Sequence, residues 1–242
     1  MTSRARRFAK TVPGVARLHG VLSTTARREL QDSRNLRRLL AFVLARDSNC
    51  VDVGAHEGAV LAEMVRLASD GRHVAFEPLP GFAERLRAQF PDVDVRDIAL
   101  ANRSGQASFV FVRNQPALSG LRERVYPRPP QRETITVGVQ RLDDALPAGY
   151  VPTLVKIDVE GAEGEVLAGG METIARHKPV VVFEHGKGAA PSYGTGPRDV
   201  HALLVDACGL RIFDLDGRGP FSADEFETIF EHGDRWNFVA RA

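Results

Sequence analysis

The chain has 242 residues, of which 43% are hydrophobic and 26% are charged, which is the composition of an ordinary globular protein. A net charge of +1 gives no global field that would attract nucleic acid or a membrane surface. No apolar run approaches the ~20 residues of a membrane span. The two cysteines, Cys50 and Cys208, have no metal-like spacing, so we expect a reduced, cytoplasmic protein.

The length suits one α/β domain with a large core. We expect residues 1–35 to form a basic N-terminal arm and a helical extension, and residues 36–242 to form a single domain. No apolar signal core follows the basic residues of the arm. Apolar residues at helical spacing, with arginines on the opposite side, predict the first helix over residues 24–46.

Apolar runs and helical patterns then alternate along the chain. They predict, in order, a strand at 50–53, a helix at 60–67, a strand at 73–76, a helix at 82–90, and strands at 93–98 and 106–112. Residues 113–133 differ, because four prolines and five arginines occur there without any period. We expect this segment to be a lid-like excursion from the domain.

The alternation continues in the second half of the chain. It predicts, in order, a strand at 134–139, a helix at 141–146, a strand at 154–157, helices at 162–169 and 173–176, a strand at 180–183, a helix at 199–208, and strands at 210–215 and 236–240. Alternating strands and helices indicate a doubly wound parallel sheet. No helical pattern is visible between the last two strands, so we expect an antiparallel hairpin to close the sheet.

The most informative motif follows the first predicted strand, in the string VDVGAHEG at residues 51–58. Gly54 and Gly58 permit a tight turn and the close approach of a ligand to the backbone. The glycine spacing matches neither a dinucleotide fingerprint nor a phosphate-binding loop with a lysine. Asp52 and Glu57 would repel a pyrophosphate, so this turn favours a cationic ligand.

Acidic residues also end the following strands. Glu77 lies ~20 residues beyond the first turn, where a partner of ribose hydroxyls is expected. Asp97 is a candidate partner of an adenine amino group, for which the small Ala99 leaves room. Asp158 and Glu160 follow a fourth parallel strand, and buried acids without a partner are costly. Because ligands bind beyond the carboxyl ends of such strands, we expect these acids to surround one site.

Glu184 and His185 follow the apolar run at residues 179–183, again at the carboxyl end of a strand. An imidazole titrates near neutral pH and can remove a proton from a hydroxyl. A buried structural histidine is the alternative for His185. In the first turn, His56 is more simply explained as a packing or backbone partner.

In this order, the motifs resemble those of the FkbM-type family of S-adenosylmethionine-dependent methyltransferases. The resemblance covers roughly residues 35–240, and the string KIDVEGAE at residues 156–163 is its most specific part. The other motifs that carry it are VDVGAHEG (51–58), FEP (76–78), ALANRSG (99–105), SGL (119–121), RLDD (141–144), FEH (183–185) and WNF (236–238).

The resemblance implies a class I methyltransferase fold of the Rossmann-like α/β type. That fold is a seven-stranded sheet, mostly parallel with an antiparallel last strand, and with helices on both faces. It further implies S-adenosylmethionine as cofactor and S-adenosylhomocysteine as product. The cofactor-binding residues that it implies are Asp52, Gly54, Ala55, His56, Glu57, Gly58, Glu77, Asp97, Ala99 and Asp158.

The resemblance also implies transfer of the methyl group to a hydroxyl of a sugar, a polyketide or another small secondary metabolite, as in natural product biosynthesis. His185 is our first candidate for the base that accepts the hydroxyl proton, with Asp158, Glu160 and Glu184 as rivals. A divalent metal held by these four residues is a less favoured alternative.

Two other functions stay open at this stage. One is an NAD(P)-dependent oxidoreductase on a Rossmann-like sheet, although no hydride-transfer apparatus is visible. The other is a non-catalytic nucleotide-binding module. We expect a small-molecule acceptor, no nucleic-acid partner and no membrane span, and the sequence leaves open both the identity of the acceptor and whether the chain forms a homodimer.

Overall fold

The computed structural model describes residues 23–242, so most of the expected basic arm lies outside the described residues. Helix α1 (Thr24–Val43) begins at Ser23, whose hydroxyl accepts a hydrogen bond from the backbone of Ala26 at 3.1 Å. The helix runs without a break through residue 35, where we expected the extension to end and the domain to begin.

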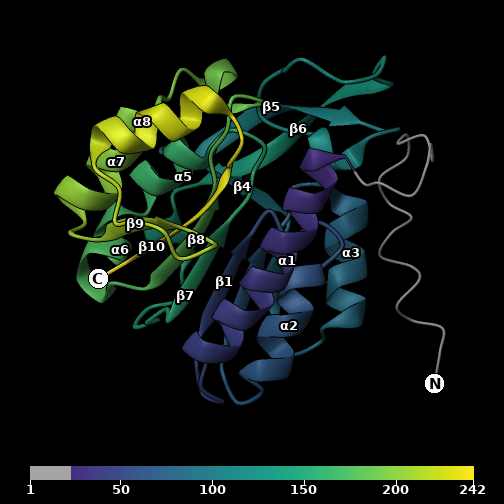
Figure 1. The fold of residues 1–242 in the computed structure, drawn as a ribbon. Coiled ribbons are helices and arrows are strands. Elements are labelled where there is room, and N and C mark those ends of the chain that lie inside the picture. The colour runs from purple at the N-terminus through teal and green to yellow at the C-terminus, as the bar shows by residue number, and fades with distance from the viewer. Residues whose placement is uncertain (1–22) are drawn as a thin grey trace, which may run out of the picture.

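Seven strands form the central sheet, which has the order β3-β2-β1-β7-β8-β10-β9 (Figure 1). The strands are β1 (Cys50–Val53), β2 (His73–Phe76), β3 (Asp94–Arg96), β7 (Leu154–Ile157), β8 (Val180–Glu184), β9 (Arg211–Asp214) and β10 (Asn237–Arg241). Only β10 is antiparallel to its neighbours. The expected seven-stranded, mostly parallel sheet with an antiparallel last strand is therefore confirmed.

The strand order reverses beside β1, because β2 and β3 lie on one side of it and β7 lies on the other. The helices that follow β1 and β7 therefore lie on opposite faces of the sheet. Such a switch point opens a crevice in which doubly wound proteins bind their ligands.

Helices cover both faces of the sheet, each above its own apolar core (Figure 1). Helices α1, α2 (Ala59–Leu67) and α3 (Pro80–Gln89) pack on one face. The opposite face is covered by α4 (Leu142–Ala145), α5 (Glu163–Gly169), α6 (Met171–His177), α7 (Pro197–His201), its π-helical continuation η4 (Ala202–Ala207), and α8 (Ala223–His232). No helix in residues 23–242 is long and apolar enough to cross a lipid bilayer.

A second, three-stranded sheet has the order β4-β6-β5 and consists of β4 (Ile98–Leu100), β5 (Gly105–Val112) and β6 (Arg132–Gln140). Our single strand over 93–98 is wrong at its end, because β3 stops at Arg96 and Ile98 pairs with Gly138 in the second sheet. A Cβ atom at Gly138 would lie 3.0 Å from the Ile98 side chain, so glycine allows this close pairing.

The last two strands pair antiparallel, as expected, but helix α8 lies between them, and our expectation of a hairpin without a helix is wrong. The helix begins with a capping box in which Ser222 and Glu225 exchange side-chain and backbone hydrogen bonds. Phe226 and Phe230 lie on its buried side. This Ser-x-x-Glu pattern before an apolar pair is the sequence signal that predicts the helix.

We predict that Phe226→Ala lowers the free energy of unfolding by about 3–5 kcal/mol, because it empties a buried site between the rings of Phe183 and Phe238. Phe42→Ala removes the same atoms from a side chain that is 90% exposed on α1 and is the matched control, with an expected change within ~0.5 kcal/mol. Urea denaturation of the three proteins measures both effects, and equal losses would contradict this packing.

Candidate active site

The first turn brings the ends of β1 and β7 into direct contact. The backbone amides of Gly54 and Ala55 both donate to the carbonyl of Phe76, at the end of β2, at 2.9 and 3.2 Å. Gly54 has a φ of +77°, and a Cβ atom there would lie 1.9 Å from the carbonyl oxygen of Asp158. Only glycine satisfies both the left-handed backbone and the close approach of the two loops.

Lys156, which we did not single out, holds this turn in place. Its ammonium donates to the carbonyl of Gly54 at 2.7 Å and lies 3.1 Å from the carboxylate of Asp52 and 3.6 Å from that of Asp158. Burial lowers the pKa of Lys156, but the neighbouring carboxylates outweigh this effect and raise it overall. A charged lysine inside an apolar strand needs acidic or carbonyl partners. Its presence in such a strand is therefore the sequence signal that predicts a structural role for Lys156.

Asp52 therefore lies behind the first turn as the partner of Lys156. The residue is fully buried and is not among the residues that line the neighbouring pocket. Its carboxylate fixes the lysine that binds the turn, so it contributes to the shape of the turn from behind.

Glu77 lies at the end of β2 with 4% of its surface exposed. One carboxylate oxygen accepts a hydrogen bond from the backbone of His56 at 2.8 Å, and the other accepts from the backbone of Leu79 at 3.0 Å. Burial raises the pKa of Glu77, and these hydrogen bonds oppose the rise. His56 has a φ of +48° and stacks on Phe82 with ring centres 4.5 Å apart, so its expected packing role agrees with this position.

One pocket joins the first turn, Glu77 and the carboxyl end of β7, and contains about 760 Å³ of empty space that is partly open to solvent. Among the expected cofactor-binding residues, those that line it are Gly54, His56, Glu77, Ala99 and Asp158. Apolar residues of β4 and β5 also line it, namely Ile98, Leu100 and Phe109. So do four residues of the 113–133 excursion: Pro116, Ala117, Ser119 and Leu121.

The remaining expected cofactor-binding residues do not line this pocket in the described part of the chain. Asp97 is ion-paired with Arg87 at 2.8 Å, and its side chain is 55% exposed. Glu57 is exposed, Ala55 is buried, and Gly58 has a φ of +77° at the start of α2.

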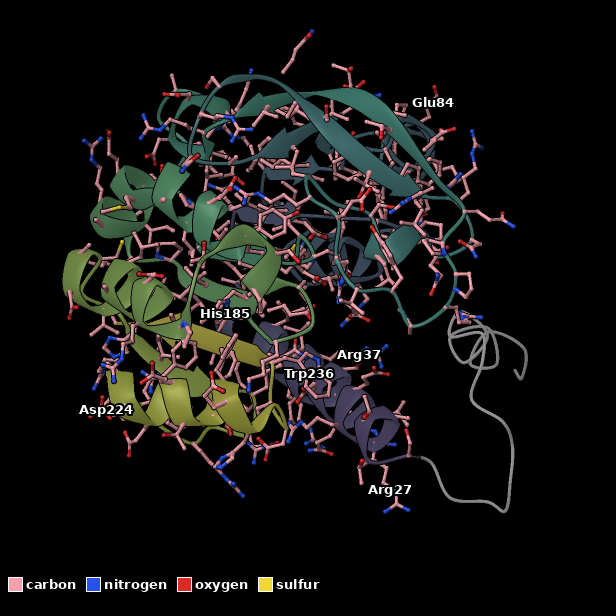
Figure 2. All side chains as sticks on the ribbon, turned by 90° about the horizontal axis from the view of Figure 1, so that it is seen from above. Arg27, Arg37, Glu84, His185, Asp224 and Trp236 are labelled. Carbon is pink, nitrogen blue, oxygen red and sulfur yellow. The ribbon has the colours of Figure 1, made fainter. Side chains whose placement is uncertain are left out.

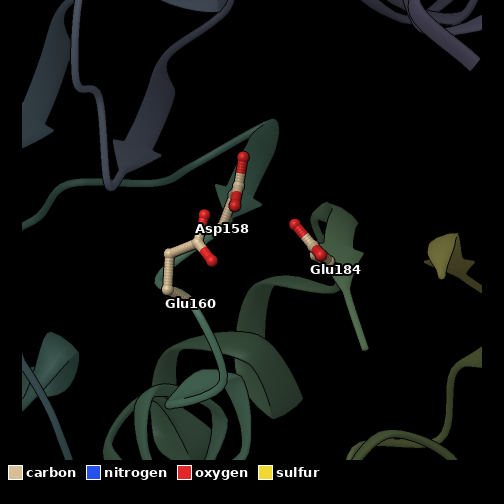
Figure 3. A group of neighbouring side chains, drawn as sticks. All are labelled: Asp158, Glu160 and Glu184. Carbon is tan, nitrogen blue, oxygen red and sulfur yellow. The ribbon is translucent and has the colours of Figure 1, made fainter. Parts of the chain in front are cut away.

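Three carboxylates converge where β7 and β8 end (Figure 3). Oxygens of Asp158, Glu160 and Glu184 all lie within 4.8 Å of one another. Burial and the charge of Asp158 raise the pKa of Glu160 to about 8, and Arg124, its ion-pair partner, opposes this rise. Burial and the charges of Asp158, Glu160 and Glu163 raise the pKa of Glu184 well above its usual value. Burial and mutual repulsion therefore make these carboxyl groups hold a proton more tightly than isolated carboxyl groups do.

A fourth acid, Glu163, shapes the loop that carries the cluster. One of its carboxylate oxygens accepts hydrogen bonds from the backbone of Val159 and of Gly161, both at 3.0 Å. These bonds support Glu160, whose φ of +58° is unusual for a residue with a side chain. Burial raises the pKa of Glu163 to about 7.

The structure does not bring His185 to the pocket. Its side chain lies beside α8 (Figure 2), stacked on Phe230 at 4.9 Å and Phe226 at 6.0 Å, and is 1% exposed. Neither ring nitrogen is hydrogen-bonded within the described residues. Burial lowers the pKa of His185 to about 4. This position corresponds to the structural alternative for His185, whereas Asp158 and Glu160 line the pocket.

Comparison with known proteins identifies the chain. The family model of the methyltransferase FkbM domain matches residues 52–212. The chain belongs to the FkbM methyltransferase family. The family that the sequence motifs resemble is therefore confirmed.

Two relatives illustrate this membership. The chain is 24% identical over 156 residues to the 2-O-methyltransferase NoeI of Sinorhizobium fredii (strain NBRC 101917 / NGR234), in a match that covers 58% of this chain and 64% of the relative. It also resembles the crystal structure of methyltransferase FkbM from Methylobacillus flagellatus KT, with a TM-score of 0.52 and 15% identity, over 82% of this chain and 44% of that one. The chain thus spans less than two thirds of the length of either relative, and the structural likeness shows the fold.

We predict that Gly54→Ala destabilises the protein by about 3 kcal/mol or more, since the new methyl group collides with the Asp158 carbonyl. Gly149→Ala is the matched control, because Gly149 has a φ of +71° but open space around its Cβ position, and we expect a cost of about 1 kcal/mol. Thermal and urea denaturation measure the difference. Similar costs at both positions would show that the loops do not meet as described.

The raised pKa of Glu163 predicts a pH-dependent stability. The folded protein holds this proton more tightly than the unfolded chain, whose glutamates titrate near 4.5, so the contribution is complete below that pH. It is lost as the pH rises through about 7, by up to about 3 kcal/mol.

We therefore expect Glu163→Gln to become more stable relative to the parent protein between pH 5 and pH 8, as measured by urea denaturation at each pH. Glu84→Gln, which removes an exposed carboxyl from α3 (Figure 2), is the control for the loss of one negative charge. A constant difference between Glu163→Gln and the parent across this range would contradict the assignment.

Proposed function

We propose that this methyltransferase transfers a methyl group to a hydroxyl oxygen of a small metabolite such as a sugar or a polyketide. The observation that carries the proposal is the single pocket that joins Glu77, at the end of β2, to Asp158 and Glu160, at the end of β7. A methyl donor with a ribose diol, an amino group and a sulfonium charge matches carboxylates at these positions.

The residues of the pocket fit the parts of S-adenosylmethionine in order. The Gly54 turn would hold the methionine portion, and Glu77 would accept hydrogen bonds from the ribose hydroxyls with the lone pairs that its backbone contacts leave free. Ile98, Ala99 and Leu100 would cover the adenine ring. The bound cofactor supplies the electrophilic methyl group, and the protein supplies alignment and exclusion of water, which are worth up to ~7–11 kcal/mol.

Glu160 is the base that we propose for the acceptor hydroxyl. As the new O–C bond forms and the C–S bond breaks, the hydroxyl proton must leave, and a positioned base contributes ~10²–10⁴-fold. Glu160 lines the pocket, and its raised pKa makes its carboxylate a stronger base than an exposed glutamate. Asp158 and Glu184 are close enough to share the proton, whereas His185 lies away from the pocket.

The comparisons support an oxygen acceptor, because the relative NoeI is named a 2-O-methyltransferase. Membership of a methyltransferase family argues against the oxidoreductase and the non-catalytic alternatives. The carboxylate cluster is also compact enough to share a cation, but Arg124 already neutralises Glu160, so a divalent metal stays the less favoured alternative. The two cysteines without metal-like spacing and the net charge of +1 also lead us to propose a cytoplasmic location and an acceptor other than nucleic acid.

We predict that calorimetric titration shows binding of S-adenosylhomocysteine, and that Glu77→Ala weakens it by ~10–100-fold, through the loss of charge-assisted hydrogen bonds. Glu77→Gln keeps the shape and should lose less affinity. Glu84→Ala removes an exposed acid from α3 and should bind normally. If the parent protein does not bind S-adenosylhomocysteine at millimolar concentration, or if Glu77→Ala binds as tightly as the parent, the proposal fails.

A further inference from the structure

Part of the 113–133 excursion, residues 119–124, makes contacts with β5 and with the segment after β8, and we call it the strap. Its first residues are held by β5, since Gly120 pairs with Val110 and the Ser119 hydroxyl accepts a hydrogen bond from the backbone of Val112 at 3.0 Å. Ser119 and Leu121 line the proposed cofactor pocket. The strap therefore forms one wall of the pocket.

The middle of the strap is held by the segment that follows β8 and by Glu165 of α5. The backbone of Arg122 donates to the hydroxyl of Tyr193 at 3.1 Å, and its guanidinium donates to the carbonyl of Ser192 at 3.3 Å and to the carboxylate of Glu165 at 3.1 Å. A Cβ atom at Gly120 would lie 2.9 Å from the Tyr193 hydroxyl, so the two segments touch closely. These contacts bring the strap across the ends of β7 and β8.

The far end of the strap carries Arg124 into the carboxylate cluster. Its guanidinium forms an ion pair with Glu160, and its side chain is only 13% exposed. A Cβ atom at Gly188, beyond β8, would lie 2.9 Å from the other terminal nitrogen of Arg124. The absence of a side chain at Gly188 thus gives the guanidinium room beside Glu160.

The charges around Glu160 explain why a cation is needed there. Three acids lie around it: Asp158 directly after β7, Glu163 of α5 and Glu184 of β8. The ammonium of Lys156 is shared between Asp52 and Asp158. Within the described residues, Arg124 is the cation that pairs with Glu160. An arginine in this position offsets repulsion that would otherwise turn the Glu160 side chain away.

We propose that Arg124 is a positioning residue, which docks the strap on Glu160 and so completes the pocket wall and fixes the proposed base toward the acceptor. This inference rests on the proposed function of the pocket. It predicts that the cofactor affinity depends on the pairing of Arg124 with Glu160, because a strap without this contact must be ordered when the cofactor binds.

The test is a double-mutant cycle read by calorimetry with S-adenosylhomocysteine, on the full chain. We expect Arg124→Gln and Glu160→Gln each to weaken binding about 10-fold, and the double variant to bind no more weakly than either single variant, since both break one contact. Arg124→Lys keeps the charge and should recover most of the affinity. Arg128→Gln, at an exposed arginine of the same excursion, is the matched control and should bind normally.

Hydrogen exchange without any ligand gives a second, independent result. We expect the amides of Gly120 and Arg122 to exchange at least 10-fold faster in Arg124→Gln than in the parent protein, and Arg124→Lys to restore their protection. Normal affinity and normal protection in Arg124→Gln would overturn the inference, as would additive losses in the cycle. If the parent protein fails to bind S-adenosylhomocysteine, the proposed function falls, and the exchange measurement still decides whether Arg124 docks the strap.

Discussion

The buried ammonium of Lys156 is the interaction on which the rest of the site depends. It neutralises Asp52, which has no exposed surface, and it binds the carbonyl of Gly54 at the turn where the strand order reverses. A buried carboxylate that lost this partner would cost several kcal/mol, on the order of 3–5. The ion pair therefore keeps the ends of β1 and β7 together, and with them the loops that carry Gly54 and Asp158.

Carboxylates in this site hold the backbone as well as face the pocket. Glu77 binds the amide of His56, and Glu163 binds the amides on both sides of Glu160. His56 and Glu160 are two of the three non-glycine residues with positive φ among residues 23–242, and both line the pocket. Such conformations persist only where the surroundings impose them, and they concentrate at functional sites. The acids are therefore part of the architecture that places the proposed base.

Much of the fold follows from local sequence. Strands β1, β2 and β7 are short runs buried at every position, and the helices between them have clear apolar faces, so the parallel sheet could be predicted. The acids that end β7 and β8 converge because neighbouring parallel strands end at the same edge. Helix α8 was missed because its apolar residues are separated by acids, and the same omission misplaced His185, which the rings of α8 cover.

Other parts of the site could not be predicted from the sequence. Arg124 reaches Glu160 across 36 residues of chain from a segment without a period, so its partner is set by tertiary structure alone. Asp97 lies between β3, which belongs to the central sheet, and β4, which belongs to the second sheet, and it does not line the pocket. The spacing of apolar residues along the sequence indicates which residues are buried and whether they belong to a helix or a strand. It does not report which loops meet above a sheet.

A crystal structure of the protein with S-adenosylhomocysteine would test the central claim most directly. We expect the amino-acid portion to lie against the Gly54 turn, the ribose hydroxyls to bind Glu77, and the sulfur atom to face Asp158 and Glu160. A ligand bound elsewhere, or a ribose that does not contact Glu77, would contradict it.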